Sequence, residues 1–116
     1  MSFDVILLNE KGEPVIVENH SEGGTYVMGG TRDAELNVTY NYSHFYYQHL
    51  NGKEGLRWLN GKKAKDVIDA LEKAIRELGI ERDSDYWEAT EGNAGYALRI
   101  LLTWARQYPD AVFEVY

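Results

Sequence analysis

The chain has 116 residues, a size typical of one domain, so we expect residues 1–116 to form a single domain with one core. Its 19 acidic and 12 basic residues give a net charge of −7. This charge disfavours direct binding to nucleic acid, because such binding depends on Lys and Arg neutralising phosphates. The absence of cysteine from the sequence excludes disulfides, thiolate metal ligands and cysteine nucleophiles.

The sequence gives no indication of a leader or a membrane anchor. The first residues, Met1–Asp4, lack the basic region of a secretory signal. No segment approaches the roughly 20 apolar residues that span a bilayer. We therefore expect a cytoplasmic protein that does not bind membranes.

The first third of the chain predicts β-structure. Short apolar runs at Phe3–Leu8 and Pro14–Glu18 flank a polar turn that contains glycine, which is typical of a hairpin. Thr25–Met28 is predicted as a third short strand between paired glycines. Ala34–Tyr42 is the clearest strand, because apolar and polar residues alternate along it with a period of two.

The second half of the chain predicts helices. Ser43 is expected to cap a short helix at His44–Leu50. Apolar residues recur every three or four positions in Lys62–Leu78 and Gly92–Tyr108, which predicts two longer amphipathic helices. Asp110–Tyr116 is predicted as the last strand. These elements predict an α+β fold, with a mainly antiparallel sheet of about five strands and two main helices packed on one of its faces.

The predicted strand Ala34–Tyr42 indicates the first candidate binding site. Its polar face forms a polar stripe that consists of Glu35, Asn37, Thr39, Asn41 and Ser43. Asparagine is depleted in strands, and its amide offers donors and an acceptor that suit a polar ligand or a partner. Two alternatives stay open, namely the solvated face of a half-covered sheet and internal hydrogen bonding.

A second candidate site is the segment Asp83–Gly95, whose small residues lead into the last predicted helix. Free N–H groups at a helix start can hold an anion. The segment lacks both glycine-rich nucleotide motifs, so we favour helix capping by Thr90 or Asn93, with the small residues packed against the sheet. Trp87 is expected to be a partly buried anchor. Trp87, Asn93 and the aromatic Tyr46 are added to the candidate ligand- or partner-binding residues.

Signals for catalysis and for metal binding are weak. His44 and His49 are five residues apart, which does not match the spacing of a helical zinc motif, so we expect no metal and no cofactor. Ser43 beside His44 does not make a catalytic triad. We assign no catalytic residue and favour a non-enzymatic protein. The alternative is a small hydrolase or transferase with Glu35 or His44 as the general base.

Four stretches between Glu35 and the end of the chain carry a family resemblance. They are Glu35–Ser43, Leu56–Lys62, Tyr86-Trp87 and Gly92–Ala105 with Pro109-Asp110. Together they resemble a family of small proteins encoded by bacteriophages and prophages, for which we know no activity that could be assigned to these residues. The resemblance implies a setting in which small acidic accessory proteins act by stoichiometric binding.

This setting leads to the functional hypothesis. We expect a phage or prophage accessory protein that binds a host protein, related to defence, or a small polar ligand such as a nucleotide. A structural or homo-oligomeric phage component is the remaining alternative. The resemblance concerns setting alone, and fold-level or family-level analogy does not establish a mechanism.

Overall fold

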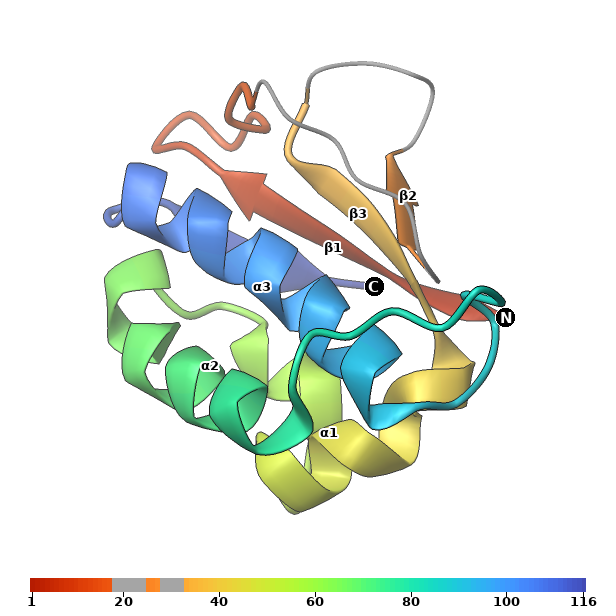
Figure 1. Cartoon of the computed structure of the whole chain (residues 1–116). Coiled ribbons are helices and arrows are strands. Elements are labelled where there is room, and N and C mark those ends of the chain that lie inside the picture. Colours follow the sequence, from red (N-terminus) through yellow and green to blue (C-terminus); the bar gives the residue numbers. More distant parts are fainter. Residues whose placement is uncertain (18–24, 28–32) are drawn as a thin grey trace.

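An antiparallel sheet forms one layer of the molecule, and the helices lie on one side of it (Figure 1). The computed structural model describes residues 1–17, 25–27 and 33–116. Its strands are β1 (Ser2–Leu8), β2 (Thr25–Val27), β3 (Glu35–Thr39) and β4 (Val112–Val115). Their spatial order is β2-β3-β1-β4. The helices are α1 (Ser43–His49), α2 (Ala64–Leu78) and α3 (Glu91–Gln107), with short 3-10 helices η2 (Tyr40–Tyr42) and η3 (Gly55–Leu59).

The expected sheet of about five strands with two main helices is wrong. The described residues are α+β, but they form three strands of four or more residues, β1, β3 and β4, and the three-residue β2. They also contain three α-helices. Residues 14–17 of the expected second strand make only isolated bridges, at Pro14 and Ile16. Pro14 has no N–H to donate, so a regular ladder cannot pass through it. Glu18 and Met28, at the ends of two expected strands, lie outside the described residues.

The expected strand Ala34–Tyr42 ends early. The Thr39 hydroxyl accepts a hydrogen bond from the Asn41 backbone N–H at 3.2 Å, which caps η2 and turns the chain away from the extended conformation. Ser43 does not cap α1 as expected, because its hydroxyl donates to the Tyr40 carbonyl oxygen at 2.7 Å. The period-two alternation of the sequence therefore stops describing the backbone after Thr39.

The core lies between the sheet and α3. Alternate residues of β1, namely Phe3, Val5 and Leu7, are buried, while the residues between them are partly exposed. Most residues of α3 are buried, which fits a helix that lies between the sheet and a second helix. That second helix is α2, which packs along α3 (Figure 1). None of the helices in residues 1–17, 25–27 and 33–116 has the length and apolar composition needed to cross a membrane.

The chain before α2 covers the outer edge of β4. Helix α2 begins at Ala64, later than the expected Lys62, because the preceding residues pair with that edge. The Gly61 N–H donates to the Phe113 carbonyl oxygen at 2.8 Å, and the Phe113 N–H donates to the Lys62 carbonyl oxygen at 3.0 Å. The Asn60 side chain accepts from the Val115 N–H at 2.9 Å. These contacts satisfy backbone groups that an open sheet edge leaves unpaired.

Candidate functional site

The predicted polar stripe does not form one open surface. Asn37 and Thr39 are only 4% and 1% exposed. The Asn37 amide donates to the Ser2 hydroxyl at 2.6 Å and to the Asp4 carboxylate at 2.8 Å, so it ties β3 to β1. Thr39 uses its hydroxyl to cap η2. Of the interpretations left open for the stripe, internal hydrogen bonding is therefore the one that describes Asn37 and Thr39.

Glu35 and His44, the alternative general bases, are not joined into an acid–base pair. Glu35 lies partly exposed at the start of β3. His44 is exposed on α1, where its ring lies 3.9 Å from the ring of Phe45, measured between centroids. In the described part of the chain neither side chain has a hydrogen-bonded or charged partner. A general base needs a group that orients it, and the described residues supply none to Glu35 or His44.

The structure instead brings together four of the predicted residues, Asn41, Tyr46, Trp87 and Asn93, whereas the Ser43 hydroxyl donates to the Tyr40 carbonyl oxygen. The connection between α2 and α3, residues 79–90, is hydrogen-bonded to η2 through Asn41 and Tyr42. The Asn41 amide donates to the Trp87 carbonyl oxygen at 2.8 Å. The Tyr46 hydroxyl donates to the Ala94 carbonyl oxygen at 3.0 Å, in the first turn of α3. We call residues 79–90 the acidic loop, because they hold four acidic residues and one arginine.

A buried asparagine organises this loop. Asn93, fully buried in the first turn of α3, accepts a hydrogen bond from the Asp83 N–H at 2.9 Å. Its amide donates to the carbonyl oxygens of Asp85 and Glu88, at 3.2 and 3.0 Å. The backbone N–H of Asn93 donates to the Thr90 hydroxyl at 3.1 Å, so Thr90 is the N-cap, as one of the two expected caps. A single side chain thus fixes the loop backbone at three points.

Two glycines let the loop lie against α3. A Cβ atom on Gly92 would stand 1.8 Å from the carbonyl oxygen of Glu81, and one on Gly95 would stand 1.8 Å from that of Gly79. No side chain fits at either position without moving the backbone. The expectation that the small residues pack on the sheet is wrong for Gly92 and Gly95, because both face the acidic loop. The local pattern of the sequence does not report where this loop lies.

Two aromatic side chains stand out from the fixed loop. Tyr86 and Trp87 are 38% and 45% exposed, and their ring centroids are 5.2 Å apart. Trp87 is thus more exposed than the partly buried anchor that we expected. Its backbone is held on both sides, because its N–H donates to the Asp85 carboxylate at 3.0 Å and its carbonyl accepts from Asn41. We call Asn41, Tyr86 and Trp87 the aromatic corner.

The buried phenols of Tyr42 and Tyr46 donate hydrogen bonds to the backbone of the acidic loop and of the first turn of α3. The Tyr42 hydroxyl donates to the Tyr86 carbonyl oxygen. Burial raises the pKa of Tyr42 to about 12, with smaller opposing effects of Arg82, which lowers it, and Asp85, which raises it. Burial also raises the pKa of Tyr46 well above its usual value. Both phenols therefore stay protonated at neutral pH and keep their role as donors.

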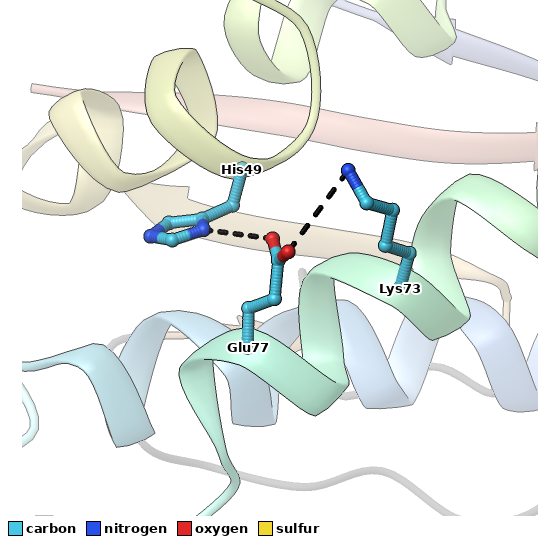
Figure 2. Close-up of polar contacts among 3 residues, drawn as sticks. All are labelled: His49, Lys73 and Glu77. Atoms are coloured by element: carbon cyan, nitrogen blue, oxygen red, sulfur yellow. Dashed lines mark hydrogen bonds and ion pairs between the residues drawn. The ribbon is translucent and has the colours of Figure 1, made fainter.

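A second polar cluster joins α1 to α2 (Figure 2). His49 Nδ1 lies 2.9 Å from Glu77 Oε1, and Lys73 Nζ lies 3.9 Å from Glu77 Oε2. The hydrogen bond with His49 is the largest effect that lowers the pKa of Glu77. The described residues contain no group of three His, Asp or Glu side chains that could hold a metal ion. We interpret the cluster as a contact between helices, which sequence reasoning missed because its members are 28 residues apart.

Comparison with protein-family models, with curated proteins and with solved structures finds no match to this chain. The resemblance to phage and prophage proteins therefore stays a prediction. The candidate site rests on its geometry alone: two exposed rings on a loop whose backbone is held by Asn41, Tyr42 and Asn93.

Proposed function

We propose that this protein acts without catalysis, by stoichiometric binding of a partner protein at the aromatic corner. The observation that carries the proposal is the exposure of Tyr86 and Trp87 on a loop fixed by hydrogen bonds. Tryptophan and tyrosine are enriched among the residues that dominate binding energy at protein interfaces. A fixed loop also loses little conformational entropy when a partner binds, which favours affinity.

The charge of the loop indicates the chemistry of the partner. Four exposed acidic residues flank Tyr86 and Trp87 in the sequence, namely Glu81, Asp83, Asp85 and Glu88. Carboxylates around an apolar contact favour a partner that presents Lys or Arg, and they speed the encounter. We therefore propose a partner with an apolar groove and a basic rim. The phage resemblance and the expected cytoplasmic location suggest a host protein, related to defence, as the source of that surface.

A small polar ligand has less support than a partner protein. That hypothesis relied on the open side chains of the polar stripe, and two of its central members, Asn37 and Thr39, are buried and hydrogen-bonded within the fold. A ligand could reach them only if the sheet opened. The enzymatic alternative has less support as well, because residues 1–17, 25–27 and 33–116 provide no group that orients Glu35 or His44 as a base.

The test is capture of the partner with matched variants. The wild-type protein should retain one host protein, and Trp87→Ala should lose it, because truncation of a central aromatic residue at an interface typically costs about 2 kcal/mol or more. Tyr47→Ala is the control, since Tyr47 is 46% exposed and lies outside the corner. The captured protein is then purified and titrated by calorimetry, where we expect a one-to-one complex.

Three results would oppose the proposal. These are the absence of any retained protein, equal retention by wild type and Trp87→Ala, or equal loss with Tyr47→Ala. A panel of nucleotides tests the small-ligand alternative. A rise of several degrees in melting temperature would support that alternative, because a ligand stabilises the native state by mass action.

A further inference from the structure

A basic strip covers the chain before α2 and the first residues of that helix. Residues 53–65 hold five of the 12 basic residues and one acidic residue, Glu54. The five basic residues are Lys53, Arg57, Lys62, Lys63 and Lys65. The end of this strip follows the outer edge of β4, where its backbone pairs with Phe113. In a chain with net charge −7, such a concentration of positive charge needs an explanation.

Most of these cations lack a carboxylate partner. In the described part of the chain, only Lys65 is in an ion pair, with its Nζ 3.3 Å from Asp110 Oδ1. The Arg57 guanidinium lies over the Phe3 ring at 4.9 Å, and Lys62 Nζ lies over the Trp58 ring at 4.8 Å. Ring contacts of this kind hold a cation in place and leave its charge unneutralised.

The acidic loop is the counterpart of the strip. None of its carboxylates, at Glu81, Asp83, Asp85 and Glu88, is in an ion pair with a described residue. Its one arginine, Arg82, lies over the Tyr96 ring at 4.7 Å. The ion pairs among described residues lie elsewhere, on α1, α2, α3 and Asp110.

The fold keeps the end of the strip away from the loop. Lys62, Lys63 and Lys65 lie at the start of α2, and the acidic loop begins at its end. The 15 residues of α2 span about 22 Å, at 1.5 Å per residue. Within one chain, the described residues form no ion pair between the strip and the acidic loop. Between two copies, each surface can meet its complement.

We propose that the chain self-associates, with the acidic loop of one copy against the basic strip of another. Charge complementarity between these two surfaces selects a second copy as the occupant. The inference goes beyond the proposed function, since the strip is not part of the aromatic corner. The two functions share the acidic loop, so a captured partner would compete with self-association.

The sign of the salt dependence distinguishes this proposal from simple repulsion. A protein of net charge −7 with evenly spread charge repels its copies most strongly at low salt. Complementary surfaces behave in the opposite way, because screening weakens their attraction. We expect the average mass measured by sedimentation equilibrium to rise with protein concentration at about 0.01 M salt, and to stay at the monomer value at about 1 M salt.

Charge reversal supplies the specific test. Lys62→Glu with Lys63→Glu should abolish association, and so should Glu81→Lys with Glu88→Lys. The side chains of both glutamates make no hydrogen bond within the described residues, so their reversal leaves the loop contacts of Asn93 in place. The variant with all four changes keeps the net charge of −7 and exchanges the two signs, so association should return. Circular dichroism and melting temperature check that each variant is folded.

Three results would overturn the proposed self-association. A wild-type protein that is monomeric at low salt at every concentration overturns the proposal, and so does association that survives either double reversal or increases with salt. Lys62→Glu with Lys63→Glu leaves the aromatic corner unchanged, so this variant should still capture the partner protein. Loss of association with retained capture therefore separates this inference from the proposed function.

Discussion

The side-chain oxygen of Asn93 accepts a hydrogen bond from the backbone N–H of Asp83, 2.9 Å away and ten residues earlier in the chain. This contact makes the first turn of α3 the anchor of the acidic loop. Tyr86 and Trp87 lie within the segment that it fixes, between Asp83 and Glu88. The side chain of Asn93 thus holds the backbone on both sides of the two exposed rings.

Replacement of Asn93 by alanine should release the acidic loop. The change removes three side-chain hydrogen bonds and leaves buried polar groups without partners, so we expect a loss of about 1–3 kcal/mol in the free energy of unfolding. Asn41→Ala removes one bond at an exposed site and is the control, with an expected loss of about 1 kcal/mol. Urea unfolding measures both losses. Hydrogen exchange at the Asp83 amide should accelerate in Asn93→Ala, and an unchanged rate would contradict the anchoring role.

Substitution of Gly92 or Gly95 by alanine should destabilise the protein, although alanine favours helix. In a free helix this change is worth about 1 kcal/mol in favour of alanine. Here each new Cβ would stand 1.8 Å from a loop carbonyl oxygen, so we expect a net loss of about 1–3 kcal/mol from overpacking. Gly52→Ala is the control, since its Cβ would have only an ordinary contact at 3.9 Å. Urea unfolding distinguishes the two signs, and a stabilised Gly92→Ala would show that the loop does not lie on α3.

Local patterns predicted those parts of the fold that depend on neighbouring residues. The periodicity of apolar residues located α2 and α3 to within two residues, because a helix buries one face with a fixed period. The same reasoning placed Asn37, Thr39 and Asn41 on one face of a strand, and it was wrong for Asn41, because β3 ends at Thr39. The capping bond of the Thr39 hydroxyl ends the strand, and such side-chain bonds compete with an extended backbone. The residues Thr39, Asn41 and Ser43, which alternate with tyrosines after Val38, carried that signal.

The candidate site depends on contacts between distant segments, which periodicity does not report. Asn41 and Trp87 were both singled out from the sequence, but their hydrogen bond joins positions 46 residues apart. The loss of the strand at Pro14 was foreseeable in principle, since proline lacks the N–H that a ladder needs. The sequence alone thus identified several members of the corner, and the structure was needed to show that they meet.

The contact between His49 and Glu77 should make stability depend on pH in the acid range. The hydrogen bond from His49 lowers the pKa of Glu77 below its ordinary value of 4.5. A carboxyl with a lowered pKa in the folded state stabilises the protein above its ordinary pKa, and this contribution is lost as the pH falls through the lowered value. The free energy of unfolding of Glu77→Gln should therefore fall below that of wild type at pH 6, and the difference should shrink below pH 4.5. Lys73→Ala, which removes the longer contact of 3.9 Å, should show a smaller difference. Equal losses at both pH values would oppose this account.

The buried phenol of Tyr42 should make the folded protein sensitive to alkali. Its pKa is raised from 10.0 to about 12, chiefly by burial, so the folded state binds its proton more tightly than the unfolded state. The raised pKa of Tyr42 therefore stabilises the folded state fully below pH 10, and this stabilisation is lost as the pH rises towards 12. Tyr42→Phe should be less stable than wild type at pH 8, because the Tyr86 carbonyl oxygen loses its donor, and the difference should narrow with rising pH.

Ultraviolet titration of the phenolates provides a second measurement of the Tyr42 pKa. One tyrosine with a pKa near 12 should be missing from the profile of Tyr42→Phe, whereas Tyr47→Phe, changed at an exposed position, should retain it.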